Sequence, residues 1–189
     1  MLKKLLICLI AIIFLNACKT FSLVNNGELV DPGGIKVKPI MSWNQQKTDN
    51  EFYWTLDGRF LNEIGFISVK ENGYIMPLKN RWGVVDSKSP KYNENMNILE
   101  IPAFIQEAWE IHGFQKFTTI LIEPTLFLKN KGFKFHFTGT TLDGLNKLGI
   151  VYGTIIEKKL YIMMYSGAVI EFYEKGKDDF IQMAESATL

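Results

Sequence analysis

Histidine and cysteine are scarce in this chain of 189 residues, which contains two of each. The histidines, His112 and His136, stand alone, because neither belongs to a His-x-x-x-His, His-Glu or paired-carboxylate motif of the kind that holds a metal ion. We therefore expect no metal site and no cofactor. The 21 basic and 20 acidic residues nearly balance, so the charge gives no reason to expect nucleic acid as a partner.

The most apolar stretch of the chain is too short to cross a membrane. Met1-Leu2-Lys3-Lys4 leads into an apolar segment that runs from Leu5 to Phe14. A transmembrane helix needs about 20 apolar residues, whereas about ten after a basic start are typical of a signal peptide. We predict that residues 1–17 are an export signal and are cleaved off.

The predicted signal ends in Leu15-Asn16-Ala17-Cys18, which resembles the lipobox of bacterial lipoproteins. In that family a Leu stands three positions before an obligatory Cys, and a small residue directly precedes the Cys. The resemblance implies that signal peptidase cuts between Ala17 and Cys18, and that Cys18 is acylated on its sulfur and amino group. Membrane lipid is then the first expected partner. The alternatives are an ordinary secreted protein with a chance cysteine and an uncleaved anchor.

The residue after the lipobox bears on localisation. Lys19 stands where, in enterobacteria-like systems, an Asp favours retention in the inner membrane. The resemblance therefore implies a protein of the cell envelope, anchored in the outer membrane and facing the periplasm. With Cys8 in the leader and Cys18 acylated, the folded part would contain no thiol, which excludes a disulfide and a cysteine nucleophile.

The residues after the lipobox change in composition. Asn25-Asn26-Gly27 and Asp31-Pro32-Gly33-Gly34 favour turns and irregular backbone. We predict that residues 18–38, beginning with the lipidated cysteine, are a flexible tether. Residues 39–189 are predicted to form a single globular domain, because no repeat or composition shift marks a second one.

Several segments of this domain are typical of strands. Phe133, Phe135 and Phe137 alternate with Lys and His, which indicates a strand with one solvent-facing side. β-Branched and aromatic residues bounded by turn signals such as Asp57-Gly58 and Asn72-Gly73 indicate further strands. The predicted strands cover residues 51–56, 61–69, 74–76, 117–122, 132–138, 149–156 and 160–166, and 169–173 extends the last one or pairs again.

Two segments are typical of helices. The first begins at Pro102 and ends at Gly113, and the second begins at Asp178-Asp179. Strands that follow one another through short turns indicate an antiparallel sheet, with the helices covering at least one face. The predicted fold class is α+β, with helices packed on an antiparallel sheet in an α/β/α sandwich-like arrangement.

Parts of the domain resemble known families. Trp43-Asn44, Trp54 to Gly58, Gly132 to Phe135 and Lys159 to Tyr165 resemble proteobacterial lipoproteins of unassigned activity. The second half, a hairpin followed by an aromatic strand and a helix ending near Ser186, is similar in outline to PsbP-like domains. That resemblance implies a binding or assembly module, and neither family supplies a catalytic residue to carry over.

The sequence offers little for catalysis. Ser166, His136 and Asp143 are the residue types of a hydrolytic triad, but Ser166 lacks a Gly-x-Ser-x-Gly elbow. The aromatic residues are more suggestive, although most are expected in the core. Trp82 and Tyr92 flank the Asn-rich loop at residues 87–97, so we predict them to be exposed and available to a partner.

These observations favour a non-enzymatic, membrane-anchored lipoprotein whose domain binds or assembles with another envelope protein. The alternative is an envelope hydrolase or a protein that binds a small ligand or a glycan. A water-accessible pocket with convergent titratable groups would favour the alternative, and a flat apolar patch would favour the interaction module.

Overall fold

A computed structural model of the protein describes residues 21–47, 52–76 and 85–189. The predicted leader, with Ala17 and Cys18, lies outside the described residues, and so does Trp82. The strands are β1 (Ser22–Val24), β2 (Trp43–Lys47), β3 (Phe52–Thr55), β4 (Asn62–Val69), β5 (Gln115–Phe127), β6 (Asn130–Thr140), β7 (Asn146–Ile156) and β8 (Lys159–Ala168). The helices are α2 (Ile101–Ile111) and α3 (Phe172–Ser186).

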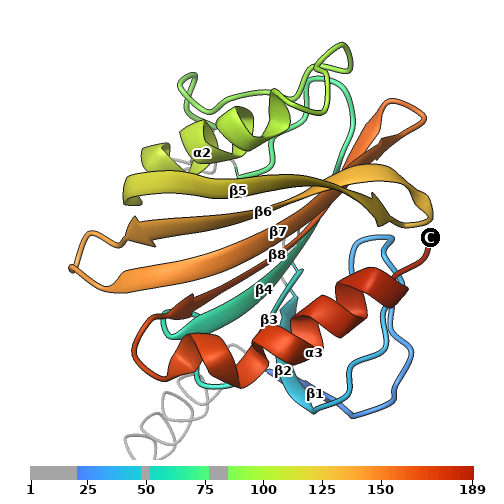
Figure 1. Ribbon diagram of the computed structural model, residues 1–189, viewed down its shortest axis with the longest axis vertical. Coiled ribbons are helices and arrows are strands. Elements are labelled where there is room, and N and C mark those ends of the chain that lie inside the picture. The colour runs from blue at the N-terminus through green and yellow to red at the C-terminus, as the bar shows by residue number, and fades with distance from the viewer. Residues whose placement is uncertain (1–20, 48–51, 77–84) are drawn as a thin grey trace, which may run out of the picture.

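All of these strands belong to one antiparallel sheet in the order β1-β2-β3-β4-β8-β7-β6-β5 (Figure 1). Tight turns at Leu128-Lys129 and Glu157-Lys158 join β5 to β6 and β7 to β8, and all four turn residues have positive φ. Such turns match the right-handed twist of the strands they connect. The pairing of β4 with β8 joins the N-terminal and C-terminal halves of the sheet.

The predicted fold class was wrong in its balance of elements. Strand accounts for 45% of the structure and helix for 17%, so the fold is dominated by a single eight-stranded antiparallel sheet rather than being an α+β sandwich. The strands from β5 to β8 are 10–13 residues long. Their length makes the sheet much larger than the two described helices that accompany it.

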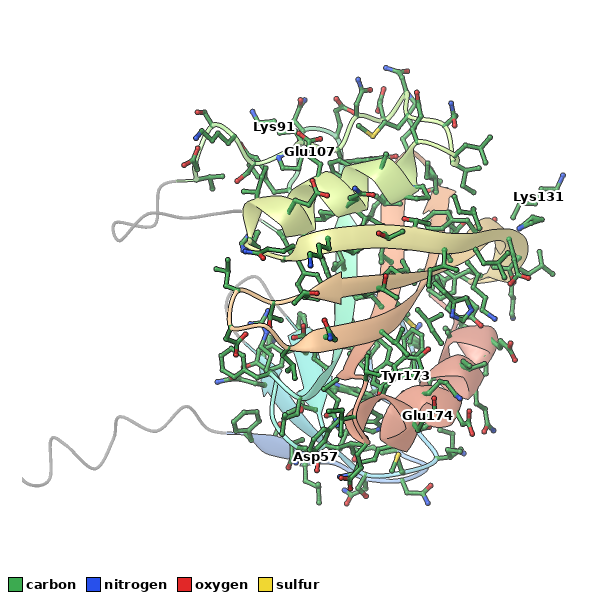
Figure 2. The ribbon with its side chains drawn as sticks, turned by 60° about the vertical axis from the view of Figure 1, so that its left-hand side comes forward. Asp57, Lys91, Glu107, Lys131, Tyr173 and Glu174 are labelled. Atoms are coloured by element: carbon green, nitrogen blue, oxygen red, sulfur yellow. The ribbon has the colours of Figure 1, made fainter. Side chains whose placement is uncertain are left out.

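The sheet separates two hydrophobic cores. Trp43, Trp54 and Tyr165 belong to the core beneath α3, whereas Phe135 and Trp109 belong to the core beneath α2. Figure 2 shows Glu107 on α2 and Glu174 on α3, on opposite sides of the strands. Because neighbouring residues of a strand point to opposite faces, each long strand supplies both cores.

Residues 21–38 belong to the folded domain, so the prediction of a flexible tether was wrong for this segment. β1 pairs with β2, and Val24, Ile35 and Val37 are buried in the core beneath α3. The backbone of Lys36 exchanges two hydrogen bonds with that of Thr188, of 2.7 and 3.1 Å. The Asn, Gly and Pro residues do form turns, but the apolar residues between them anchor the segment.

Other predicted elements differ in detail. The strand expected at residues 74–76 is absent from the described structure, because the edges of β4 are occupied by β3 and β8. Helix α3 begins at Phe172, six residues before the predicted start, so residues 172–173 are helical rather than part of a strand. Neither described helix is long and apolar enough to span a membrane.

Candidate functional site

A cleft of about 440 Å³ lies between the segment at residues 26–40 and the C-terminal half of α3. Its walls are built by backbone hydrogen bonds, because Gly27 N donates to Pro39 O at 2.8 Å and Val30 and Val37 exchange two bonds of 3.0 Å. The lining residues are Asn26, Gly27, Leu29, Lys36, Val37, Lys38, Pro39, Ile40, Gln182, Ser186 and Thr188.

The chemistry of this cleft is cationic and polar. Lys36 and Lys38 supply positive charge, and Gln182 supplies an amide. The Ser186 hydroxyl donates to Gln182 O at 2.7 Å, so it is already used within the helix. No Asp, Glu or His is among the lining residues. The cleft therefore has groups that attract an anion but no side chain suited to general acid–base catalysis.

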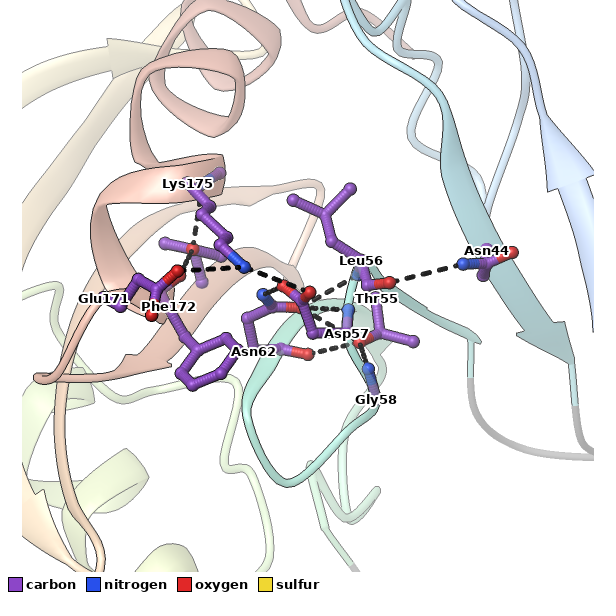
Figure 3. Close-up of polar contacts among 11 residues, drawn as sticks. Asn44, Thr55, Leu56, Asp57, Gly58, Asn62, Glu171, Phe172 and Lys175 are labelled. Atoms are coloured by element: carbon purple, nitrogen blue, oxygen red, sulfur yellow. Dashed lines mark hydrogen bonds and ion pairs between the residues drawn. The ribbon is translucent and has the colours of Figure 1, made fainter.

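A network of polar residues closes the turn between β3 and β4 (Figure 3). The side-chain oxygen of the fully buried Asn62 accepts from the backbone N–H groups of Leu56 and Asp57, at 2.8 and 3.2 Å. Asn62 Nδ2 donates to Asp57 Oδ2 at 2.7 Å, and Lys175 from α3 lies 3.2 Å from Asp57 Oδ1. These contacts confirm the predicted turn at Asp57-Gly58 and give its polar groups a structural role.

Two unusual polar groups lie on the α2 face near this end of the sheet. The Lys147 side chain is buried, and its Nζ lies 3.4 Å from the Arg59 carbonyl oxygen. Burial lowers the pKa of the Lys147 ammonium, an effect that the nearby carboxylate of Glu63 opposes. Ser166 pairs with Glu63 in the sheet, and its buried hydroxyl has no hydrogen-bond partner among the described residues.

Proximity of Ser and Lys is one way to activate a nucleophile, but burial argues against that role for Ser166. Ser166 is only 1% exposed, so a substrate has no route to its hydroxyl. The structure also keeps the three residue types of a hydrolytic triad apart. Residues that pair across strands share one face of the sheet. His136 pairs with Ile150, and Ile150 pairs with Tyr165 in the core beneath α3, so His136 is on the α3 face. Ser166, next to Tyr165, is on the α2 face. Asp143 lies in the exposed turn before β7, bonded to the Thr141 hydroxyl.

The two histidines occupy ordinary positions. His136 is half-buried, and its burial, together with the nearby Lys134, lowers its pKa. His112 ends α2 and is exposed, with Nε2 3.0 Å from Met76 O. Within the described residues, no group of three or more His, Cys, Asp or Glu side chains is placed to hold a metal ion.

The predicted exposure of Tyr92 was wrong, because its side chain is 0% exposed. Its backbone N–H donates to Gly73 O at 2.8 Å, and its carbonyl accepts from Asn72 N at 2.9 Å. The ring lies near Phe104 of α2, with centroids 6.4 Å apart. These contacts hold the polar loop against the α2 core, so Tyr92 offers no surface to a partner.

Exposed apolar side chains are present on β5, which forms one edge of the sheet. Ile120, Leu121, Ile122 and Leu126 are each about half or more exposed. We call these four residues the β5 strip. Sequence patterning missed it because three consecutive aliphatic residues are also typical of a strand that is buried on both faces. A register irregularity between Thr119 and Ile122 helps to turn these side chains outward.

The backbone of this edge is poorly suited to pairing with another strand. The two-residue turn makes Phe127 and Asn130 a hydrogen-bonded pair, so alternation along β5 points the backbone of Pro124 toward the free edge. Proline has no N–H to donate there. The β5 strip is therefore suited to side-chain contacts rather than to the addition of a strand.

Comparison with known proteins bears on the fold. No family model matches the chain, and the search of curated proteins gives no match. Among solved structures, cyanobacterial PsbP (CyanoP) from Synechocystis sp. PCC 6803 is similar, with a TM-score of 0.54 and 11% identity over 92% of this chain and 95% of CyanoP. LpqN, involved in cell envelope biogenesis of Mycobacterium tuberculosis, has a TM-score of 0.36 and 7% identity over 92% of this chain and 86% of LpqN. The similarity to CyanoP confirms the resemblance in fold to PsbP-like domains.

Proposed function

We propose that the protein is a lipoprotein of the cell envelope, anchored through Cys18, whose domain is a non-enzymatic module that binds or assembles with another envelope protein. The β5 strip is the observation that supports the binding role. Three of its residues, Ile120, Leu121 and Ile122, are consecutive and each about half exposed, and exposed apolar side chains that adjoin one another are candidates for burial against a partner. In contrast, the polar network around Asn62 and Asp57 stabilises a turn and its contact with α3, so its groups are already used within the domain.

The anchoring part of the proposal rests on Leu15-Asn16-Ala17-Cys18. Acylation would attach several chains to Cys18, and each buried methylene adds about 0.8 kcal/mol to membrane affinity. Lys19, in place of Asp, favours the outer membrane with the domain facing the periplasm. This sorting is part of the proposal and follows from the lipobox resemblance.

Replacement of the predicted lipidated residue tests the anchor. Cys18→Ala should abolish incorporation of a labelled fatty acid and leave an unprocessed precursor that migrates more slowly. Mass spectrometry of the wild-type N-terminal peptide should give a mass that includes the acyl chains on Cys18. Normal processing of the Cys18→Ala chain would overturn the lipobox assignment.

Site-specific crosslinking tests the binding role. A photoreactive phenylalanine analogue replaces Leu121 in the β5 strip, and a matched chain carries it at Ile170, which is also strongly exposed but lies just before α3. We expect the Leu121 chain to capture the same envelope protein reproducibly and the Ile170 chain not to capture it. Identical captures from the two positions would refute a role for the strip.

A charge within the strip provides the second arm of this test. Leu121→Glu should abolish the specific crosslink when the photoreactive residue is placed at Leu126. Because Leu121 is exposed, this substitution should leave the free energy of unfolding nearly unchanged. A crosslink of unchanged yield would show that the strip does not supply the contact energy.

The cleft supports a second candidate function, the binding of a small ligand. Its volume of about 440 Å³ lies within the usual range for ligand pockets, and Lys36 and Lys38 favour an anionic ligand. Native mass spectrometry of protein purified from membranes should then detect a bound small molecule. Lys36→Glu together with Lys38→Glu should release it, while Leu121→Glu should not. If Leu121→Glu released the small molecule and the double lysine substitution did not, the cleft would be excluded as its binding site.

A further inference from the structure

The folded domain begins very close to the proposed lipid anchor. Three peptide units separate Cys18 from Phe21, the first described residue, and Ser22 already pairs with Gln45 in the sheet. A fully extended chain spans at most about 3.5 Å per residue, so the Cα atoms of Cys18 and Phe21 can lie no more than about 10 Å apart. This distance is short compared with the 30 Å hydrocarbon core of a typical bilayer.

The surface at this position combines apolar and basic side chains. Phe21 is 47% exposed and Leu23 is 59% exposed, although both lie at the start of the folded domain. They alternate with Ser22, so they share one side of β1, while Val24 points into the core. Lys47 is exposed at the end of β2. Because Ser22 pairs with Gln45, the end of β2 at Gln46 and Lys47 lies beside the start of β1 at Phe21.

This combination matches a membrane surface. Apolar side chains at an interface enter the boundary between headgroups and acyl chains, and basic side chains are attracted to anionic headgroups. Lys47 lies on the neighbouring strand β2, and its amine is 5.0 Å from the centroid of the Phe52 ring on β3, on the face of the sheet opposite to Leu23. The acidic residue Glu28 lies beyond the opposite end of β1, where its exposed carboxylate accepts from the backbone N–H of Asn25 at 2.9 Å.

We propose that the β1 edge of the domain, formed by Phe21 and Leu23, lies directly against the lipid bilayer, with Lys47 on the neighbouring strand close enough to meet anionic headgroups. The inference rests on the proposed acylation of Cys18. The domain is thus docked on the membrane in one orientation rather than suspended on a flexible tether.

Docking through β1 also fixes the direction of the proposed partner surface. β1 and β5 are the two edges of the same eight-stranded sheet. Neighbouring strands lie about 4.8 Å apart, so seven spacings separate β5 from β1 by up to about 34 Å across the sheet. The β5 strip would therefore face away from the bilayer, toward proteins of the periplasm.

The scarcity of cysteine makes this orientation measurable. Cys8 lies in the predicted leader and Cys18 would carry lipid, so an introduced cysteine is the one free thiol of the mature chain. Leu23→Cys and Leu126→Cys form a matched pair, since both replace an exposed leucine, one on β1 and one on β5. Each is labelled with an environment-sensitive nitrobenzoxadiazole dye.

The labelled, lipidated proteins are reconstituted into vesicles of phosphatidylethanolamine and phosphatidylglycerol. We expect the dye at residue 23 to emit at shorter wavelength than the dye at residue 126. Lipids that carry a nitroxide on the acyl chain should quench the dye at residue 23 severalfold more strongly. Equal emission and equal quenching at the two positions would overturn the docked orientation.

Two further readouts separate the possible failures. The intact mass of each protein reports acylation, so an acylated chain whose residue 23 remains in water refutes docking while the anchor stands. A chain without acyl groups refutes both the lipid anchor and the docking that rests on it. Lys47→Glu in the Leu23→Cys protein should weaken quenching on vesicles with phosphatidylglycerol more than on vesicles of phosphatidylcholine alone; an equal effect on both would exclude the electrostatic contribution of Lys47.

Discussion

The indole N–H of Trp43 donates a hydrogen bond of 2.6 Å to Oδ2 of Asp179, which lies on α3. The other carboxylate oxygen of Asp179 accepts from the backbone N–H of Ile40 at 2.8 Å. Trp43 and Asp179 are both buried. One carboxylate thus attaches β2 and the preceding segment to the C-terminal helix, which explains why residues that were expected in a tether are folded.

Removal of this carboxylate should destabilise the domain. Asp179→Ala leaves the buried indole N–H of Trp43 and the partly buried backbone N–H of Ile40 without their acceptor, so we expect the free energy of unfolding to fall by about 2–3 kcal/mol. Urea denaturation followed by tryptophan fluorescence measures the change. Asp178→Ala is the matched control, because Asp178 is the exposed neighbour of Asp179 on the same helix. Equal effects of the two substitutions would contradict the role of Asp179.

Substitution of Gly149 should also destabilise the protein. The ring of Phe137 covers Gly149 from the neighbouring strand, and an added methyl carbon would collide with that ring and lie 2.7 Å from the carbonyl oxygen of Tyr165. We expect Gly149→Ala to cost about 1–3 kcal/mol, since backbone in the middle of a sheet cannot move aside. Thermal unfolding monitored by circular dichroism measures the cost.

Gly65→Ala is the control for this substitution. A methyl group at Gly65 would meet the flexible side chain of Met164 at 3.2 Å, and Met adapts readily to changes in packing. Its effect should be clearly smaller than that of Gly149→Ala. A larger loss in Gly65→Ala would show that the two positions have been ranked wrongly.

Lys147 should make stability depend on pH on the alkaline side of neutrality. Burial lowers the pKa of this ammonium in the folded state below its ordinary value of 10.5. Between the two pKa values the unfolded chain binds more protons than the folded chain, so the free energy of unfolding rises with pH. Lys147→Met removes this dependence and should stabilise the protein at pH 7 by roughly 1 kcal/mol.

Urea denaturation of wild type and Lys147→Met at several pH values between 7 and 10 tests this expectation. The difference in stability between the two proteins should shrink as the pH approaches 10, because the wild-type amine loses its proton in the folded state. A difference that stays constant over this range would show that burial does not oppose the charge of Lys147.

Two buried tyrosines should respond differently to loss of the hydroxyl. Tyr165 Oη donates to Tyr173 O at 2.8 Å and accepts from Gly176 N at 3.2 Å. The hydroxyl of Tyr152 has no partner at ordinary hydrogen-bond geometry among the described residues, although burial and, after it, the nearby Glu185 carboxylate raise its pKa. Tyr165→Phe should therefore lower the free energy of unfolding by about 1–3 kcal/mol, whereas Tyr152→Phe should be neutral or stabilising.

Both substitutions should reduce the loss of stability at high pH. Burial raises the pKa of each phenol above its ordinary value of 10.0. Above pH 10 the unfolded chain releases these protons while the folded chain retains them, so the free energy of unfolding falls as the pH rises. Denaturation between pH 9 and pH 11 should give a shallower decline in either variant than in wild type. An unchanged slope in both variants would contradict the raised pKa values.

Much of the sheet was predictable because strands and tight turns leave local patterns. The alternation of Phe133, Phe135 and Phe137 predicted β6, and the charged pair Glu157-Lys158 predicted the turn between β7 and β8. Exposure was harder to predict. Tyr92 lies in a polar loop and is nevertheless buried, because α2 and the backbone of Gly73 pack around it.

The candidate site was less predictable than the strands. Ser166 and His136 suggested a shared site by residue type, yet they lie on opposite faces of the sheet. Ile120, Leu121 and Ile122 of the β5 strip were predicted to be in a strand and Leu126 was not, and the exposure of all four depends on β5 being an edge. Strand order is set by contacts between segments that are distant in the chain, so it cannot be predicted from local sequence patterns.

From the sequence alone come the predictions of a leader and of lipidation at Cys18, and the correct prediction of most of the strands, because each depends on residues that are near neighbours in the chain. Only the tertiary structure decided that residues 21–38 are folded, that strand predominates over helix, and that β1 and β5 form opposite edges. These properties depend on contacts between side chains that lie far apart in the sequence, such as the buried hydrogen bond that joins Trp43 to Asp179 across 136 positions of the chain.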